Sequence, residues 1–319
     1  MIVTVTLNPI LERRYSFNGI NYPGVNRNGS LTIGAGGKGL NVSRQLNRLG
    51  TASLAFTFLG GLNGKLLRDV LKEEDINFTS VKTNSETREG VVLIDEKEGK
   101  VTYIFGADRE VTTEEADEFR EKLEKIIQNC EIVLFSGSSP CSNTDSIFPL
   151  GIEAANRYDK ISVCDTYGIH LSDCIKAKPT IMHNNLSELE KSLGIELNSE
   201  EKILTYLDDL YNSGIKQCYI TNAEKTFYSS NFDFHFKIKP PLIQSIDSTG
   251  SGDSFVAGII YGWHKDLTFE EGLKLATALG TANSSRYEVC NITLKEAETL
   301  LPAVDVVPIG KKMKTLDVT

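Results

Sequence analysis

The hydrophobic residues of the chain follow two patterns that alternate along its length. Short, almost continuously apolar runs are typical of strands buried on both faces, whereas apolar residues three or four positions apart indicate amphipathic helices. Runs of the first kind are Ile2–Leu7, Ser53–Leu59, Glu131–Ser136, Ile161–Asp165, Thr180–His183 and Gln217–Thr221. Their alternation with helical patterns predicts an α/β fold with a mostly parallel, doubly wound sheet. Ligands of such folds bind beyond the carboxyl ends of the strands.

Three of the predicted helices begin with a capping box, in which a threonine and a glutamate three residues later cap each other's backbone amides. The pairs are Thr112 with Glu115, Thr268 with Glu271, and Thr293 with Glu296. We therefore expect a helix to start directly after each of these threonines.

Two segments, residues 11–33 and 87–106, interrupt the alternation. Both are rich in Tyr, Val, Ile, Thr and Phe and have no helical period, which predicts strands. We expect them to form a small antiparallel β-sheet that projects from the main domain. That domain would comprise residues 1–10, 34–86 and 107–319. We expect the tail from Ala303 to Thr319 to be partly frayed.

Composition limits the classes of function. The 319 residues carry a formal net charge of −9, which argues against nucleic acid or an anionic membrane as a partner. An anionic substrate would therefore need a local cluster of basic residues. The chain opens without the features of a signal peptide and has no long apolar run, so we expect a cytoplasmic protein. The six cysteines and four histidines have no metal-like spacing.

A glycine-rich turn, Asp247–Asp253, precedes an apolar segment with the pattern of a helix. Backbone amides at the start of such a helix point to one place and bind anions, assisted by the helix dipole. Here they belong to Gly250, Ser251, Gly252 and Asp253. A carboxylate at this place is explained if Asp253 is a general base, activating a hydroxyl that attacks a phosphoryl group held by the amides. Taken alone, the motif also fits a plain turn with a helix cap.

A second glycine-rich motif lies far earlier in the chain. It runs from Gly36 through Lys38 and Asn41 and continues with Gly50 and Gly60. Together the two motifs resemble the paired signatures of the ribokinase-like (PfkB) carbohydrate kinases. The resemblance extends from Thr4 to about Ala282. It implies an ATP-dependent kinase whose β-sheet segment is a lid, and lids of two subunits often form a homodimer in this family.

The resemblance also assigns residues to the phosphate donor. Asn185 and Glu188 match the NxxE motif that positions Mg²⁺ in the family, through water, although an asparagine cap followed by a glutamate fits the same spacing. The residues implied to face ATP are Asn185, Thr221, Asn222, Ala223, Thr226 and Asn283. A monovalent cation is implied by the resemblance alone.

On the acceptor side, Thr6–Glu12 resembles the TLNPxxD opening of the 1-phosphofructokinase and tagatose-6-phosphate kinase branch, whose acidic residue bonds sugar hydroxyls. Glu12 replaces that aspartate and adds one methylene. Arg27 and Arg88 match arginines that meet the phosphate of the sugar, and Lys38 would complete the basic cluster. The residues expected to bind substrate are Glu12, Arg27, Gly36, Gly37, Lys38, Asn41, Arg88, Ser136 and Ser138.

The nucleotide loop departs from the family pattern. Where the family shows S/T-x-G-x-x-G, this chain has Thr221–Thr226 without either glycine. A Cβ at these places could block close approach of the backbone to a phosphate, and Glu224 adds a like charge. The metal strand ends His183-Asn184-Asn185 in place of Lys-Pro-Asn. Asp165–Gly168 resembles a family DxxG turn and is interpreted as structural, with the Asp165 carboxylate bonding nearby amides.

Three functions fit these observations. The hypothesis we adopt is a kinase that uses MgATP to convert a ketohexose monophosphate, fructose 1-phosphate or tagatose 6-phosphate, into the bisphosphate. The second is a PfkB kinase of an unphosphorylated sugar or nucleoside, which would leave Arg27 and Arg88 without a purpose. The third is a sugar-phosphate-binding regulator that has lost turnover. The missing glycines favour the regulator, whereas Asp253 in an intact turn speaks against it.

Overall fold

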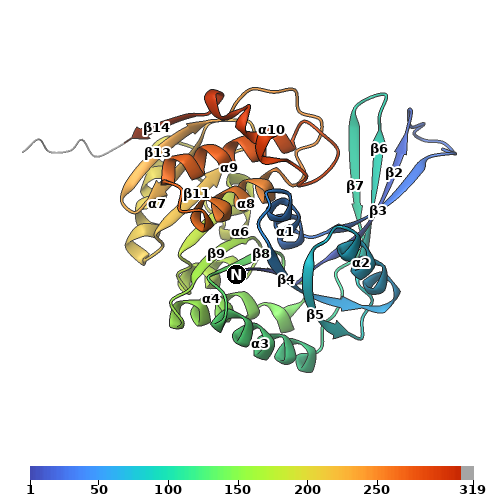
Figure 1. Cartoon of the computed structure of the whole chain (residues 1–319), viewed down its shortest axis with the longest axis horizontal. Coiled ribbons are helices and arrows are strands. Elements are labelled where there is room, and N and C mark those ends of the chain that lie inside the picture. Colours follow the sequence, from blue (N-terminus) through green and yellow to red (C-terminus); the bar gives the residue numbers. More distant parts are fainter. Residues whose placement is uncertain (310–319) are drawn as a thin grey trace, which may run out of the picture.

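The computed structural model describes residues 1–309, which form a ten-stranded sheet and a separate four-stranded sheet (Figure 1). In spatial order the large sheet contains β14 (Asp305–Ile309), β13 (Phe234–Lys239), β12 (Phe227–Asn231), β11 (Gln217–Thr221), β10 (Ile181–Asn185), β9 (Ile161–Thr166), β8 (Ile132–Gly137), β1 (Ile2–Thr6), β4 (Ser53–Gly60) and β5 (Asn77–Thr83). The strands from β5 to β11 are parallel. Strands β12, β13 and β14 extend the sheet in antiparallel pairs.

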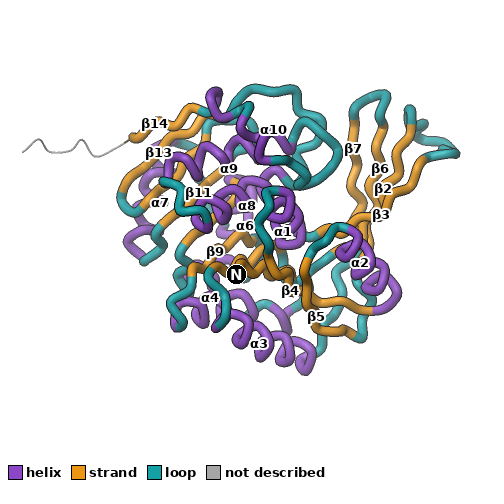
Figure 2. The backbone as a smooth tube through the Cα atoms, viewed as in Figure 1, coloured by secondary structure: helices purple, strands orange, loops and turns teal. Residues whose placement is uncertain are grey.

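Helices cover both faces of the large sheet (Figure 2). One face carries α1 (Lys38–Arg48), α2 (Gly61–Glu73), α8 (Ser251–His264), α9 (Phe269–Asn283) and α10 (Leu294–Glu298). The other carries α3 (Thr113–Gln128), α4 (Ile147–Arg157), α5 (Leu171–Lys176), α6 (Leu186–Leu193) and α7 (Glu200–Ser213). Alternate residues of one strand supply the two cores: in β8, Leu134 packs with the first set and Phe135 with the second. The prediction of a doubly wound α/β fold is confirmed.

The predicted capping boxes are all present, at the starts of α3, α9 and α10. The six predicted strands are present too, with ends shifted by one or two residues. The prediction for the tail was wrong in part, because Asp305–Ile309 pairs with β13 as an ordered edge strand. The basic stretch Lys311–Lys314 lies outside the described residues. Among residues 1–309, no helix combines the length and apolar content that a membrane crossing requires.

The small sheet contains β3 (Ser30–Gly36), β2 (Ile10–Phe17), β6 (Arg88–Asp95) and β7 (Lys100–Phe105), in this spatial order. It consists of two antiparallel hairpins joined by a parallel pairing of β2 with β6. The sheet, which we call the lid, stands beside the main domain at the right of Figure 1. The lid segments predicted from the sequence coincide with these strands to within a few residues.

Candidate functional site

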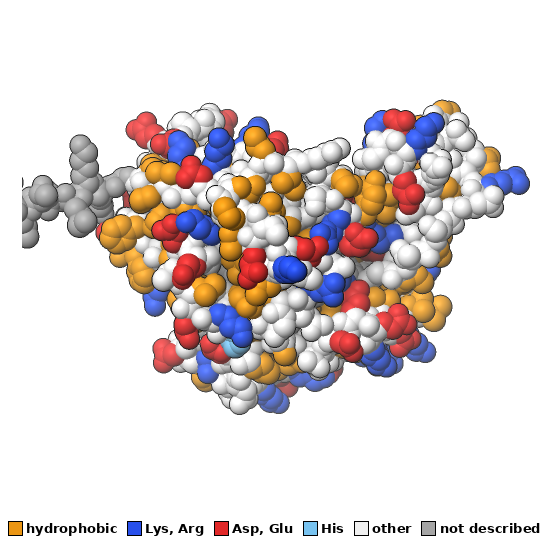
Figure 3. Space-filling model, turned by 45° about the horizontal axis from the view of Figure 1, so that its top comes forward, with side chains coloured by type: hydrophobic (Ala, Val, Ile, Leu, Met, Phe, Trp, Pro, Cys, Tyr) orange, Lys and Arg blue, Asp and Glu red, His pale blue; other side chains and the backbone are white. Residues whose placement is uncertain are grey.

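A cavity of about 660 Å³ opens at the carboxyl ends of the parallel strands, between the main domain and the lid. Residues that follow β1, β8, β10 and β11 line it together with lid strands and the start of α8. This is the edge at which doubly wound sheets bind ligands. On the face shown in Figure 3, Lys and Arg side chains are interspersed with Asp and Glu. Attraction for an anion therefore depends on local contacts inside the cavity.

The glycine-rich turn starts α8 at the floor of the cavity. Gly250 has φ 79° and a Cβ there would lie 2.3 Å from Val289 Cγ1, so both conformation and space require glycine. The amide of Ser251 donates to Ser248 O (3.1 Å), so this member of the predicted anion site is already bonded. The amides of Gly252 and Asp253 lie in the first turn, where a helix offers them no acceptor. They are the two best placed to bind an anion.

Asp253 is buried below these amides. Its Oδ2 accepts a hydrogen bond from Asn41 Nδ2 (2.8 Å), and Asn41 Oδ1 in turn accepts one from Arg44 Nη1 (2.8 Å). Burial, helped by the charges of Asp165 and Glu188, raises the pKa of Asp253 to about 6. A carboxylate with this pKa is a suitable proton acceptor near neutral pH. Asn41 therefore orients the candidate base in addition to lining the cavity.

Lys38 projects from the start of α1 into a group of carboxylates. Its Nζ lies 3.3 Å from Asp165 Oδ1 and 3.4 Å from Glu188 Oε2. Burial opposes the charge of Lys38, but Asp165 and Glu188 outweigh it and hold the pKa above its usual value. The expectation that Lys38 is one member of a basic cluster with the two arginines is corrected, since its charge is neutralised here.

The interpretation of Asp165 was wrong. Its carboxylate is fully buried and bonds side chains rather than nearby amides, because it faces the space between β8 and β10. Oδ2 accepts from Ser136 Oγ (2.8 Å), and Oδ1 lies 2.9 Å from His183 Nδ1. His183 Nε2 is 3.1 Å from Thr221 Oγ1, so the network reaches the loop after β11 that lines the cavity. The substitution of His183 for the usual lysine was a signal for this network.

Three further predicted substrate residues lie elsewhere. Arg27 is exposed in the loop between β2 and β3, away from the cavity lining, because this loop is at the tip of the lid. Ser136 is buried beneath the cavity, where its hydroxyl serves Asp165. Gly36 leaves room for Glu12, since a Cβ on it would lie 2.5 Å from Glu12 Oε1. Gly37, in contrast, lines the cavity.

At the lid end, Arg88 and Ser138 both line the cavity. Arg88 Nη2 donates to Asn8 O (3.2 Å), and Asn8 Nδ2 donates to Ser138 Oγ (3.1 Å). Glu12 also faces the cavity and forms an ion pair with Arg14 (2.9 Å). Asn8 follows the first strand and therefore lies at the edge of the sheet where ligands bind. The sequence does not predict its hydrogen-bond partners.

A contact between the lid and the glycine-rich turn was not predicted. Tyr103 of β7 donates a hydrogen bond from its hydroxyl to the Asp247 carboxylate, whose other oxygen accepts from the amide of Thr249 (2.9 Å). Burial, and then this bond, raise the pKa of Tyr103, so the hydroxyl stays a donor. Nothing in the sequence around Tyr103 indicates that its hydroxyl bonds the distant Asp247.

The end of the cavity where the nucleotide was predicted is lined by Thr221, Ala223 and Glu224. Ala223 has φ 49°, in the left-handed region that glycine favours, and Lys225 N donates to Asn222 O (2.9 Å) to close the turn. The turn that a glycine would form is therefore kept without glycine.

Three residues predicted at the nucleotide lie outside the cavity lining, Asn222, Thr226 and Asn283. Asn283 is buried because it joins two loops: its Nδ2 donates to Thr249 O (2.8 Å) and its Oδ1 accepts from Cys290 N (2.7 Å). It holds the glycine-rich turn in place.

Asn185 and Glu188 line the cavity opposite that turn. Asn185 Oδ1 caps α6 by accepting from Ser187 N (3.0 Å), and Glu188 pairs with Lys38. Within the described residues, no group of three or more His, Cys, Asp or Glu could hold a metal ion. The two residues fit a Mg²⁺ ion that is held chiefly by phosphate oxygens and water, as Mg²⁺ in kinases usually is.

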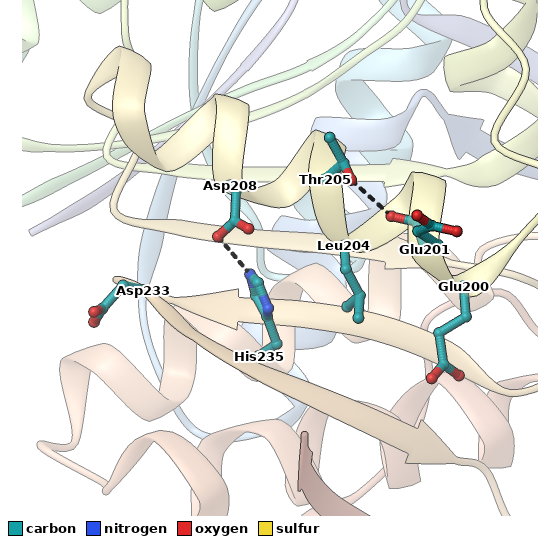
Figure 4. A pocket seen from close by; sticks show the side chains of 7 residues that line it. All are labelled: Glu200, Glu201, Leu204, Thr205, Asp208, Asp233 and His235. Atoms are coloured by element: carbon teal, nitrogen blue, oxygen red, sulfur yellow. Dashed lines mark hydrogen bonds and ion pairs between the residues drawn. The ribbon is translucent and has the colours of Figure 1, made fainter. Parts of the chain in front are cut away.

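A second hollow, of about 540 Å³, lies under α7 at the far edge of the sheet. Figure 4 shows His235 pointing toward Asp208, and His235 Nε2 lies 3.1 Å from Asp208 Oδ1. Glu200, at its other end, pairs with Lys237 (2.5 Å). None of the predicted site residues lies here.

Comparison with known proteins decides the family. The model of the pfkB family carbohydrate kinases matches residues 5–296. The chain belongs to this family. A tagatose-6-phosphate kinase of Staphylococcus epidermidis is 29% identical over 314 residues, which cover 97% of this chain and 100% of the relative.

Solved structures agree on the fold. A possible 1-phosphofructokinase of Thermotoga maritima has a TM-score of 0.89 at 24% identity and covers 97% of this chain and 99% of its own. Phosphofructokinase-2 of Escherichia coli, in complex with fructose-6-phosphate, has a TM-score of 0.84 at 22% identity, covering 95% of this chain and 98% of its own.

Proposed function

We propose that this carbohydrate kinase phosphorylates a ketohexose monophosphate, fructose 1-phosphate or tagatose 6-phosphate, with MgATP and yields the bisphosphate. The observation that carries the proposal is Asp253, a buried carboxylate with a pKa of about 6 that lies beside the free amides of a helix start. A proton acceptor and an anion site at one point are what transfer of a phosphoryl group to a hydroxyl requires.

In the proposed reaction, Asp253 accepts the proton of the acceptor hydroxyl as that oxygen attacks the γ-phosphoryl group of ATP, whose bond to the bridging oxygen breaks so that ADP leaves. Asn41 keeps the carboxylate in position through its 2.8 Å bond. The amides of Gly252 and Asp253 donate to the oxygens of the migrating group. Mg²⁺, positioned by Asn185 and Glu188 through water, would neutralise the phosphate charge.

The acceptor would lie at the lid end. Arg88, Ser138 and the Asn8 amide supply donors for the phosphate that the substrate already carries. Glu12 would accept hydrogen bonds from sugar hydroxyls, while Arg14 holds its side chain in place. A kinase of an unphosphorylated sugar would have no use for Arg88 in the lining.

The nucleotide would lie along Thr221–Glu224. The left-handed conformation of Ala223 supports ATP binding, because the backbone turn of the family is kept although its glycine is lost. This observation, together with the oriented Asp253, favours a kinase over a regulator without turnover. Asn283 would act on the nucleotide site only by holding the catalytic turn.

A homodimer formed through the lid is part of the proposal. The outer residues of the lid include the exposed apolar side chains of Leu31, Ile33 and Ile104. Exposed apolar groups gathered on one small sheet are typical of a protein interface. Light scattering of the wild type and of Ile104→Glu would test it, with a loss of the dimer expected in the variant.

A coupled ADP-release assay tests the acceptor. MgATP would be combined in turn with fructose 1-phosphate, tagatose 6-phosphate, fructose 6-phosphate, free fructose and ribose. We expect turnover with a phosphorylated ketohexose and none with the free sugars. Turnover with free fructose or ribose that survives Arg88→Ala would support the second function, and binding without any turnover would support the regulator.

A further inference from the structure

One carboxylate, that of Asp108, occupies donors that the proposed substrate needs. Asp108 lies in the loop between β7 and α3, outside the cavity lining, and its Oδ1 accepts two hydrogen bonds. One comes from Arg88 Nη1 (2.8 Å) and the other from Asn8 Nδ2 (2.8 Å). Both donors line the cavity at its lid end.

We infer that the Asp108 carboxylate stands in, in the free protein, for one oxygen of the substrate's phosphate and must leave when the sugar phosphate binds. The inference rests on the proposed function, which assigns Arg88 to that phosphate. A carboxylate oxygen and a phosphate oxygen accept the same charge-assisted bonds from a guanidinium and an amide.

Arg88 can form further hydrogen bonds to an anion larger than the Asp108 carboxylate. Its side chain is only 17% exposed. Its Nε is buried and has no hydrogen-bond acceptor among residues 1–309. A phosphate presents several oxygens to one guanidinium, whereas Asp108 uses a single oxygen for both of its donors. The exchange therefore gives Arg88 more bonds than it loses.

Asp108 is able to leave. Its side chain is 48% exposed, and the loop is held on either side of it, by Gly106 N donating to Glu89 O (2.9 Å) and by Val111 N donating to Cys141 Sγ (3.4 Å). A rotation of the side chain into solvent frees both donors without unfolding the loop. The ion pair is partly exposed to solvent, so its net contribution is small and the contacts of a phosphate dianion can exceed it.

The consequence is weaker binding of every anion that needs these two donors. Inorganic phosphate has only the contacts of its own oxygens to compensate for the displacement of Asp108. A sugar phosphate adds the contacts of its hydroxyls, so it displaces the carboxylate more readily. Asp108 would thus lower the affinity of the site for free phosphate and raise the KM for the sugar phosphate by a similar factor, because both must displace the same carboxylate.

The test compares Asp108→Asn with Glu110→Gln, which removes the same charge from an exposed position two residues along the loop. Calorimetry would measure binding of inorganic phosphate, and separately of fructose 1-phosphate and tagatose 6-phosphate, without ATP. We expect Asp108→Asn to bind phosphate about three- to tenfold more tightly and Glu110→Gln to match the wild type. The KM for the substrate should fall by a similar factor while kcat stays unchanged.

Unchanged or weaker phosphate binding in Asp108→Asn would overturn the inference, and weaker binding would show that Asp108 instead positions Arg88. Asp108→Ser serves as a second variant with a shorter side chain and must give the same direction. If no sugar phosphate is turned over by any of these proteins while Asp108→Asn still gains phosphate affinity, the proposed acceptor fails and the stand-in role of Asp108 survives.

Discussion

Replacing Asp253 with Asn removes the candidate base and also a buried charge, so it should change stability as well as activity. The pKa of Asp253 is raised from an ordinary 3.8 to about 6, chiefly by burial. Because one pKa unit corresponds to about 1.4 kcal/mol, the ionised carboxylate makes the folded protein less stable by about 3 kcal/mol at neutral pH.

The sign follows from the direction of the change. Folding raises the pKa of the Asp253 carboxyl group. The protonated group therefore contributes its full stabilisation of the folded protein below pH 3.8, its ordinary pKa. This contribution is lost as the pH rises through about 6. Asparagine has no such charge to desolvate and keeps an oxygen that can accept the bond from Asn41. Asp253→Asn should therefore gain roughly 1–3 kcal/mol over the wild type above pH 7 and little below pH 4.

Calorimetric unfolding at pH 7.5 and pH 4 would measure the difference. For a chain of this size we expect Asp253→Asn to melt about 2–6 °C higher at pH 7.5. The control is Asp69→Asn, which removes an exposed carboxylate paired only with Lys72 at 3.7 Å and should change little. In Asp253→Asn, kcat should also fall by at least about a hundredfold.

Two results would refute this reasoning. One is a melting temperature of Asp253→Asn equal to or below that of the wild type at pH 7.5. The other is a gain of the same size at both pH values, which would mean that charge is not its cause. For activity, the wild-type rate should fall below a pH of about 6 as Asp253 becomes protonated, and a rate independent of pH in this range would exclude Asp253 as the base.

Three further changes test other parts of the site. Ala223→Gly relieves a left-handed alanine and should lower the KM for ATP about two- to fivefold in steady-state kinetics; a higher KM would contradict the role of this turn. Arg88→Ala should raise the KM for the sugar phosphate by roughly tenfold to a hundredfold and leave the KM for ATP unchanged, whereas an equal rise in both would place Arg88 elsewhere. Tyr103→Phe loosens the contact of the lid with Asp247 and should increase ATP hydrolysis without acceptor about two- to fivefold, and an unchanged hydrolysis rate would show that this contact does not exclude water.

The central strands could be predicted because they are buried on both faces. Two of these short strands, Ile132–Gly137 and Gln217–Thr221, are almost wholly buried, so most of their residues are apolar. The strand Asn77–Thr83 lies at an edge with several polar, partly exposed residues, and Asp305–Ile309 carries a proline at the opposite edge. These edge strands have neither a continuous apolar run nor a clean alternation, and the sequence did not indicate them.

The site divides in the same way between local and distant contacts. Asp253 and its amides belong to one short motif, so the sequence was sufficient to predict them together. The bond from Asn41 to Asp253 joins residues 212 positions apart, and the bonds of Asp165 with Lys38 and His183 likewise join different strands and helices. Such partners follow from the order of strands in the sheet, which no single motif encodes.

Phosphorus NMR of the complete reaction tests the central claim most directly, because it separates transfer to a sugar from hydrolysis of ATP. The protein would be incubated with MgATP and fructose 1-phosphate, and in a second sample with tagatose 6-phosphate, each beside Asp253→Asn. We predict that one of the two samples of wild-type protein accumulates a second phosphate ester signal in step with ADP, and that Asp253→Asn does not. ADP with inorganic phosphate and no new ester, or a new ester formed equally well by Asp253→Asn, would contradict the function proposed for this chain.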